Sequence, residues 1–280
     1  MPELPEVEAV RRQLERAIRG TTIARVLLRR PDLRRAFPEG FASRLERQTI
    51  RSLRRRGKYL LLDLTSGDVL LIHLGMSGSF RIDKASRRLP PTDSGENGPP
   101  NAHDHVVFEL SNGSVVTFND PRRFGLMDVI RAGVGDEHRA LQSMGAEPLD
   151  ASFDAVTLAR ACANRTTALK VALLDQRVVA GLGNIYASEA LHRAGLSPRR
   201  RASTIATRHG RPRPAAFRLT NAIKAVLRRA IARQERPYRS GDFRVYDREG
   251  ERCARPGCGG TIRRIQQAGR STFFCPKCQR

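Results

Sequence analysis

Four of the five cysteines lie near the end of the sequence, in two close pairs. Cys253 and Cys258 are separated by four residues, Cys275 and Cys278 by two, and sixteen residues lie between the pairs. Thiolate pairs in turn-like Pro/Gly contexts are typical of a tetrahedral Zn²⁺ site. Because four protein ligands leave no position for water, we expect one structural Zn²⁺. The fifth cysteine, Cys162, falls on an apolar helical face and is expected in the core.

A proline and a glutamate directly follow Met1. If Met1 is removed, Pro2 exposes a secondary amine whose pKa is near 8, so that roughly a tenth of it is neutral at pH 7. Such an amine can attack a sugar aldehyde carbon and form a Schiff base. Glu3 is then a natural proton donor or shuttle. Proline and acidic residues also suit the first turn of a helix, and for these residues alone that structural interpretation is the stronger one.

Two glycine-flanked segments have the residues needed to open a DNA duplex. Residues 73–78 and 119–125 both follow predicted strands, and each presents one large side chain, Met76 or Phe124, from a tight turn. An apolar wedge beside an arginine can fill the stack when a base leaves it. Ordinary turns with both side chains in the core fit these segments equally well. A third segment, 180–189, opens a helix with two glycines and favours phosphate binding by backbone N–H groups, although this signal is weak alone.

Positive charge is concentrated in the second half of the sequence. The chain has 51 lysines and arginines against 28 acidic residues, a net charge of +23. Residues 1–150 contain 24 basic and 20 acidic residues, whereas residues 151–280 contain 27 and 8. An arginine-rich proteome would exchange lysine for arginine, but it would not remove acids from one half only. We therefore expect nucleic acid as the partner.

The sequence shows no sign of a membrane segment or a secretion signal. No run approaches the roughly 18 apolar residues of a membrane span. The first residues, MPELPEVEAVRRQ, have acids where a signal peptide needs a basic and then an apolar run. We expect a cytoplasmic, nucleoid-associated protein that has no membrane partner and is a monomer.

Apolar periodicity divides the chain into a β-rich part, a helical part and a short cysteine-bearing part. A helix is predicted over 3–19, followed by strands between 22 and 74 and a hairpin around 111–113 that suit a sandwich or barrel. The predicted helices after Gly133 are 154–163, 168–175, 184–194 and 215–233. A Pro/Gly-rich loop is predicted at 87–102. The sequence predicts an α+β multidomain protein with a β-sandwich catalytic domain at 1–133, a helical DNA-binding domain at 134–242 and a zinc finger at 243–280.

Taken together, these segments resemble the formamidopyrimidine-DNA glycosylase family, almost from one end of the chain to the other. The matching segments are PELPEVE at 2–8, RRGKYLLL at 55–62, HLGMSG at 73–78, HDH at 103–105, DPRRFG at 120–125, GLGNIYASEAL at 181–191 and GRSTFFCPKCQ at 269–279. Their order and spacing carry the resemblance more than any single motif does. The related endonuclease VIII glycosylases typically have glycine at the position of Leu4 and lack HLGMSG.

The resemblance implies both a fold and an activity. The fold is an N-terminal β-sandwich with an N-terminal helix, a helix–two-turn–helix domain and a C-terminal β-hairpin zinc finger. The activity is that of a bifunctional DNA glycosylase and AP lyase of base excision repair. Such an enzyme removes ring-opened formamidopyrimidines and 8-oxoguanine from double-stranded DNA, and also acts at abasic sites. It forms a Schiff base through its N-terminal proline and cuts the strand by β,δ-elimination.

The resemblance also implies roles for individual residues. The implied catalytic residues are Pro2 as nucleophile, Glu3 as proton donor, Lys58 in proton transfer and phosphate contact, and Arg270 gripping the phosphates of the lesion. The implied DNA-binding residues are Met76, Arg122 and Phe124, which fill the gap and contact the orphaned base, and His103, Arg165, Lys170 and Asn184. Of these last four, Lys170 and Asn184 are implied to contact phosphates.

Two alternatives remain open from the sequence alone. One is an endonuclease VIII-type glycosylase that prefers oxidised pyrimidines, and the other is a non-enzymatic zinc-finger protein that binds damaged DNA and needs no free Pro2. The chain also departs from the family pattern at 234–246, where guanine-type members usually have a loop that is longer by about a dozen residues. We therefore expect a weaker preference for 8-oxoguanine over oxidised pyrimidines, unless residues 199–214 take the place of the loop or the loop is dispensable.

Overall fold

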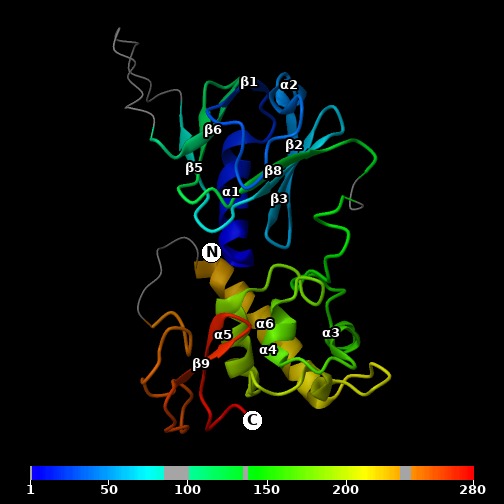
Figure 1. The fold of residues 1–280 in the computed structure, drawn as a ribbon, viewed down its shortest axis with the longest axis vertical. Helices are drawn as coiled ribbons and strands as arrows, with labels where there is room; N and C mark the ends of the chain where they lie inside the picture. The colour runs from blue at the N-terminus through cyan, green and yellow to red at the C-terminus, as the bar shows by residue number, and fades with distance from the viewer. Residues whose placement is uncertain (1, 85–100, 135–137, 234–240) are drawn as a thin grey trace. The chain divides into compact units, whose positions relative to one another are not determined.

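The computed structural model describes residues 2–84, 101–134, 138–233 and 241–280, and the chain divides into two compact units (Figure 1). The first unit comprises residues 1–2 and 6–142, and the second comprises residues 3–5 and 143–280. Most of the predicted loop at 87–102 and the first half of the segment 234–246 lie outside the described residues.

Two four-stranded antiparallel sheets form the first unit. Their strand orders are β1-β6-β7-β5 and β2-β3-β4-β8. The strands are β1 (Ile23–Leu28), β2 (Ile50–Arg56), β3 (Tyr59–Leu64), β4 (Val69–His73), β5 (Ser79–Asp83), β6 (Asp104–Leu110), β7 (Val115–Asn119) and β8 (Leu126–Ile130). The predicted hairpin at 111–113 joins β6 to β7. The expectation of a β-sandwich is confirmed.

The core of the first unit is built from branched apolar side chains of both sheets and one helix. In β3 and β4, Leu60 pairs with Ile72 and Leu62 with Leu70, and all four side chains are buried. Helix α1 (Leu4–Ile18) adds Val7, Leu14 and Ile18 at helical spacing to the same core. A short helix that the sequence did not predict, α2 (Phe41–Leu45), buries its two terminal side chains there.

The second unit is a helical bundle with a small β-hairpin. Its elements are α3 (Ala155–Cys162), α4 (Leu169–Leu174), α5 (Asn184–Ala194), the 3-10 helix η3 (Ala202–Ile205), α6 (Pro214–Arg233), β9 (Arg263–Gln267) and β10 (Arg270–Phe274). The four predicted helices match α3 to α6 within one residue at each end. Helices α3 and α5 both pack on α6, and Cys162 is fully buried, as predicted. Within the described ranges, no helix is both long and apolar enough to cross a membrane.

Candidate functional site

The carboxylate of Glu3 occupies the N-terminus of α5. It accepts the backbone N–H of Ile185 at 2.9 Å and that of Tyr186 at 3.3 Å, and Glu3 is only 2% exposed. Anionic groups are favoured at this end of a helix, where backbone N–H groups lack partners. A Cβ atom at Gly183 would lie 2.3 Å from Glu3 Cδ, so only glycine fits there. The glycine-rich segment suggested that these backbone N–H groups bind a phosphate. In the structure, both N–H groups instead donate to Glu3 and are not open to a phosphate.

Pro2 lies directly before this anchored residue and is half-buried. The backbone N–H of Leu4 donates to the carbonyl oxygen of Gly181 at 3.1 Å, and Leu4 is completely buried in the core of the helical unit. The chain on the C-terminal side of Pro2 is thus fixed by a backbone hydrogen bond, an apolar contact and the Glu3 carboxylate. This arrangement restricts where the amine of Pro2 can lie.

Lys170 of α4 is completely buried and donates three hydrogen bonds inside the protein. Its Nζ donates to Asn184 Oδ1 at 2.5 Å, to Thr272 Oγ1 at 2.7 Å and to the Ser271 carbonyl oxygen at 3.1 Å. Burial and the nearby charge of Arg270 lower the pKa of Lys170 to about 8. An ammonium group has three N–H bonds, so all of its donors are used. A direct phosphate contact by Lys170 would cost one of these bonds, and that contact stays a prediction.

Arg270 begins β10, next to the two residues that Lys170 holds. Asn184 Nδ2 also donates to the Ser271 carbonyl oxygen, at 3.0 Å. The Arg270 side chain is exposed, and no acidic side chain in the described parts of the chain pairs with it. The structure thus brings Asn184 and Arg270 to one place through Ser271. An exposed, unpaired guanidinium beside a fixed amide is suited to phosphate oxygens.

Asp120 holds the two glycine-flanked loops of the first unit together. It is completely buried, and its carboxylate accepts the hydroxyl of Ser77 at 2.6 Å and the backbone N–H of Gly125 at 2.7 Å. The loops touch so closely that a Cβ atom at Gly75, whose φ is +64°, would lie 2.3 Å from the carbonyl carbon of Phe124. Nothing in the sequence singled out Asp120, because its two partners lie on different motifs.

The predicted wedge residues are exposed at the tips of these joined loops. Met76 is 38% and Phe124 44% exposed, and both are among the few large apolar side chains on the surface of the described chain. The guanidinium of Arg122 lies 5.1 Å from the centre of the Phe124 ring. The alternative in which both apolar side chains are core residues is therefore wrong. Surface exposure next to an arginine is what insertion into a base stack requires.

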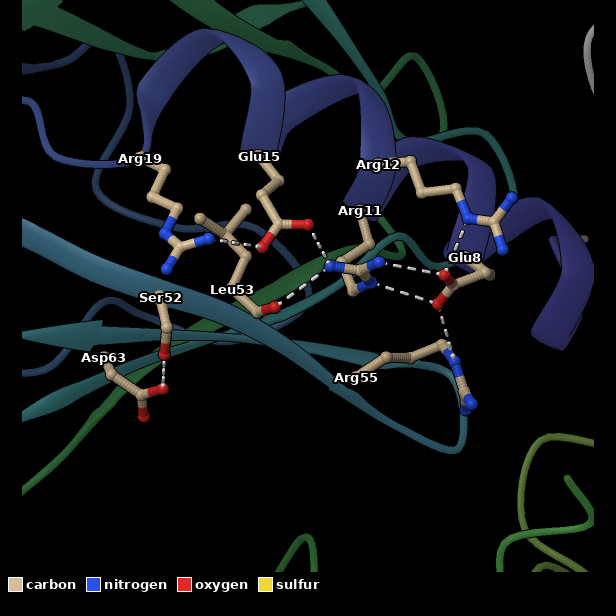
Figure 2. Close-up of polar contacts among 9 residues, drawn as sticks. All are labelled: Glu8, Arg11, Arg12, Glu15, Arg19, Ser52, Leu53, Arg55 and Asp63. Atoms are coloured by element: carbon tan, nitrogen blue, oxygen red, sulfur yellow. Dashed lines mark hydrogen bonds and ion pairs between the residues drawn. The ribbon is translucent and has the colours of Figure 1, made fainter. Parts of the chain in front are cut away.

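Glu8 is the centre of a polar network that joins α1 to β2 (Figure 2). Its carboxylate accepts hydrogen bonds from Arg11 and Arg12 of its own helix and lies 3.4 Å from Arg55 Nε of β2. Arg11 also donates to the carbonyl oxygen of Leu53 at 3.2 Å. Burial of Glu8 opposes its ionisation, but the hydrogen bonds from Arg11 and Arg12 outweigh this and lower its pKa. These contacts fix the position of α1 relative to β2.

Lys58 lies in the tight turn between β2 and β3, which this network supports. Arg55, while paired with Glu8, donates through Nη1 to the carbonyl oxygen of Gly57 at 2.9 Å. Lys58 is itself only 7% exposed. The turn that presents the predicted catalytic lysine is therefore fixed by a side chain bonded to α1. A solvated charge at a strand end, the alternative for Lys58, does not fit this burial.

His73 ends β4 beside the loop that carries Met76. Its Nδ1 accepts the backbone N–H of Gly75 at 3.0 Å, which requires a neutral ring with its proton on Nε2. Burial and the charges of Lys58 and Arg34 lower the pKa of His73 to about 4. His73 is therefore neutral at pH 7 and shapes the loop as a hydrogen-bond acceptor. His73 is the first residue of the HLGMSG segment, but its type and position in the sequence predicted no role for it.

The two remaining predicted DNA contacts lie in different units. His103 is exposed in the first unit, and its carbonyl oxygen accepts the N–H of Asp120 at 3.0 Å. Arg165, in the helical unit, is bonded to Asp175 at 3.0 Å, and hydrogen bonds from Arg177 and Arg165 lower the pKa of Asp175 to about 2. Any contact of Arg165 with a DNA phosphate therefore has to be made while its guanidinium is also bonded to Asp175.

The four clustered cysteines fit a tetrahedral zinc ion. Their sulfur atoms all lie within 4.8 Å of one another, with Cys253 and Cys278 Sγ atoms 3.8 Å apart and those of Cys258 and Cys275 3.6 Å apart. Zn–S bonds of about 2.3 Å in a tetrahedron place sulfur atoms roughly 3.8 Å apart, whereas a disulfide needs about 2 Å. The site holds one structural Zn²⁺, with four protein ligands and no position for a water ligand.

Comparison with protein families gives three matches along the chain. Residues 1–127 match the formamidopyrimidine-DNA glycosylase N-terminal domain, residues 144–240 the formamidopyrimidine-DNA glycosylase H2TH domain, and residues 250–280 the zinc finger found in FPG and IleRS. These matches cover most of the chain and agree with the sandwich, the helical unit and the cysteine-bearing hairpin.

Individual relatives extend the similarity to the full length. The formamidopyrimidine-DNA glycosylase of Bradyrhizobium sp. strain BTAi1 is 55% identical over 293 residues, covering 100% of both chains. The structure of MutM in complex with carbocyclic 8-oxo-G containing DNA superposes with a TM-score of 0.84 at 32% identity, covering 100% of both chains. The wild-type Lactococcus lactis Fpg (MutM), in complex with N7-benzyl-Fapy-dG containing DNA, gives 0.85 at 31% identity, also over 100% of both chains. The chain belongs to the formamidopyrimidine-DNA glycosylase family.

Proposed function

We propose that this bifunctional formamidopyrimidine-DNA glycosylase and AP lyase uses Pro2 as the nucleophile for both base removal and strand cleavage. The observation that carries the proposal is the anchoring of the adjacent Glu3 at the N-terminus of α5. Loss of Met1 frees the secondary amine of Pro2, which attacks C1′ of the damaged nucleotide as the bond to the base breaks. The amine gives up its proton and the departing base gains one. The sugar ring then opens as O4′ takes up a second proton, and the product is an iminium ion, the charged Schiff base of a secondary amine.

The iminium ion then allows two eliminations. It makes the C2′ proton acidic, and loss of that proton expels the 3′ phosphate; loss of the C4′ proton in a second elimination expels the 5′ phosphate. We assign proton transfer to Glu3 and to Lys58. Lys58 and Arg270 offset the negative charge of the phosphates that flank the lesion, because fixed positive groups stabilise developing charge without reorganisation. Asn184 and His103 are assigned to contacts with the DNA backbone. Arg165 is assigned to the same role, with its guanidinium shared between Asp175 and the DNA.

DNA opening is assigned to the joined loops around Asp120. Met76 and Phe124 enter the stack when the damaged nucleotide flips out, and Arg122 contacts the orphaned base. Unstacking costs a few kcal/mol per step, which apolar contact with the exposed bases offsets. Double-stranded DNA that contains oxidised bases or abasic sites is thus the proposed partner. The enzyme acts as a monomer in the cytoplasm, where chromosomal DNA lies.

Borohydride trapping tests the nucleophile. The parent protein, incubated with a duplex containing an abasic site, should form a covalent complex whose peptide map places the DNA on Pro2. Pro2→Gly, with Met1 removed as verified by mass spectrometry, should trap far more slowly. Pro5→Ala is the matched control and should trap like the parent. Equal trapping by Pro2→Gly would refute a special role for the proline.

We also propose that lesion preference is broad, because the segment between α6 and the zinc finger is short. A shorter loop offers fewer hydrogen bonds to the edge of a flipped base, and each lost bond costs about 1 kcal/mol. The neighbouring segment 199–214 contains η3 and forms bridges at Arg201 and Ala206, so it is committed to the helical unit. Single-turnover rates on matched duplexes test this proposal. Strong selectivity for 8-oxoguanine over oxidised pyrimidines would contradict it.

A further inference from the structure

We propose that Glu189 is a positioning residue, which places the hairpin that carries Arg270. The proposal rests on the role of Arg270 at the lesion phosphates given above. Glu189 lies in the middle of α5, where only 7% of it is exposed. Glutamate is almost never buried without a partner, because removing its charge from water is costly. The partner here is a stretch of backbone close to the zinc site.

The carboxylate of Glu189 binds three consecutive backbone N–H groups. Arg244 donates to both of its oxygens, at 3.0 and 2.9 Å, and Val245 and Tyr246 donate at 2.8 and 3.0 Å. Successive N–H groups that converge on one anion form a nest, in which the anion fixes the backbone conformation. One carboxylate thus accepts four hydrogen bonds from the backbone of this turn and holds the turn against α5.

The turn at 244–246 forms part of the core of the zinc finger. Val245 is completely buried together with Ile262 and Phe273. The ring of Tyr246 packs edge-on against that of Phe273, with ring centres 5.2 Å apart. Phe273 lies on β10, three residues after Arg270. A shift of the turn is therefore transmitted to the strand that begins with Arg270.

Helix α5 also contacts the hairpin directly, at Ser271 of β10. Asn184, at the start of α5, donates to the carbonyl oxygen of Ser271, and β10 packs against α5 (Figure 1). One rigid helix thus holds β10 directly at Ser271 and indirectly at Phe273, through Glu189 and the turn. Two such attachments set both the position and the tilt of the strand, and therefore where the Arg270 guanidinium lies.

The positioning role and the charge of Glu189 predict opposite effects of its neutralisation on DNA binding. Removing a negative charge from a DNA-binding protein strengthens its attraction to phosphates. If Glu189 acts by placing Arg270, its neutralisation must instead weaken binding. In Glu189→Gln the volume is kept, but the new amide turns an N–H donor toward backbone N–H groups. The turn then loses part of its anchor.

The salt dependence of binding gives a readout that loss of stability would not move. Each phosphate neutralised by the protein contributes about −0.9 to the slope of log K against log salt concentration. Arg270→Ala should make this slope shallower by about that amount, and Glu189→Gln should reproduce the change. The lyase rate of Glu189→Gln on an abasic duplex should fall about tenfold, as expected for one misplaced charged contact. Zinc content should stay at one ion per chain.

Controls separate failure of this proposal from failure of the role of Arg270. Ser188→Ala, which removes a bond only within α5, should bind and cleave like the parent. The double variant E189Q/R270A should match R270A alone, because both changes act on one contact. If R270A alters the slope but E189Q does not, or if their effects add, Glu189 is not a positioning residue. If R270A itself has no effect, the role of Arg270 fails and this proposal fails with it. Should E189Q lose zinc, Glu189→Asp, which keeps the charge but shortens the reach, is scored by the same criteria.

Discussion

The Glu3 carboxylate accepts the backbone N–H of Ile185 at 2.9 Å, although 182 positions separate the two residues in the chain. The contact depends on Gly183, where a Cβ atom would meet Glu3 Cδ at 2.3 Å. Gly183→Ala should therefore displace Glu3, lower the free energy of unfolding by about 2 kcal/mol and reduce borohydride trapping. Urea denaturation and trapping rates measure the two effects. In the double variant with Glu3→Ala, the cost to stability should be smaller than the sum; strict additivity would contradict the steric explanation.

Arg55 should affect the reaction through the turn that carries Lys58. In Arg55→Lys the positive charge stays, but an ammonium cannot contact Glu8 and the Gly57 carbonyl in the fixed geometry of a guanidinium. We expect kcat for the lyase reaction to fall about tenfold while KM changes little, a loss of about 1.4 kcal/mol in the transition state. The control is Arg12→Lys, because Arg12 also binds Glu8 but its side chain is 50% exposed. Equal kcat values for the two variants would contradict this link.

The hydrogen bonds to Asp120 should determine how firmly the loops at 73–78 and 119–125, which carry Met76 and Phe124, are joined. Ser77→Ala removes one of its hydrogen bonds, and about 1 kcal/mol of unfolding free energy should be lost. Asp120→Ala leaves the N–H of Gly125 and the hydroxyl proton of Ser77 without an acceptor, although the Ser77 oxygen still accepts the N–H of Arg122, so the loss should be about 2–4 kcal/mol. Base flipping, followed by the fluorescence of 2-aminopurine opposite the lesion, should slow in the same order. A variant of Asp120 that flips as fast as the parent would show that the loops need no such joint.

His73 should titrate far below the usual range of histidine. Its pKa is about 4 in the folded protein and near 6.5 when unfolded, so the unfolded chain binds more protons between these values. Stability should therefore fall as pH drops from 6.5 to 4, by an amount of order 2–3 kcal/mol for this residue. NMR titration of the His73 ring measures the pKa directly. In His73→Gln this part of the acid sensitivity should be absent.

Removing zinc should leave the hairpin that carries Arg270 without a fixed position in the helical unit. Cys258→Ser should lower the zinc content below one ion per chain and weaken DNA binding, because the hairpin that carries Arg270 loses its metal anchor. Arg270→Ala should bind zinc normally and still lose DNA affinity. Metal analysis and binding isotherms at one fixed salt concentration compare the two variants. Full zinc content and parental binding in Cys258→Ser would refute the assignment of this ligand.

Local patterns in the sequence predicted the helices and the zinc ligands well. The helices carry apolar residues at regular spacing, and the four cysteines lie in two short pairs, so both signals are contained within a few residues. Weak local signals explain what was missed. The helix α2 has only five residues, and the two strands outside the predicted ranges, β5 and β8, are edge strands; the apolar residues of β5, Phe80 and Ile82, are only half-buried.

The supports of the candidate site lay beyond such patterns, because they join distant parts of the chain. Glu189 binds the backbone of Val245, 56 positions away, and Lys170 binds Thr272, 102 positions away. A buried charge in a helix looks like any surface charge until its partner is known. The resemblance to a family supplied the roles of Lys170 and Asn184, but the bonds that hold them appear only in three dimensions.

The position of residues 3–5 has a consequence for any attempt to separate or exchange the two units. These residues belong to the helical unit, where Leu4 fills its core and Glu3 caps α5. A gene fragment that begins at Ser143 would encode a bundle with an empty pocket and an uncapped helix. A chimera that takes the helical unit from a relative must therefore take residues 3–5 from that relative as well. Each unit has its own core, but the core of the helical unit is complete only with a residue from the other end of the chain.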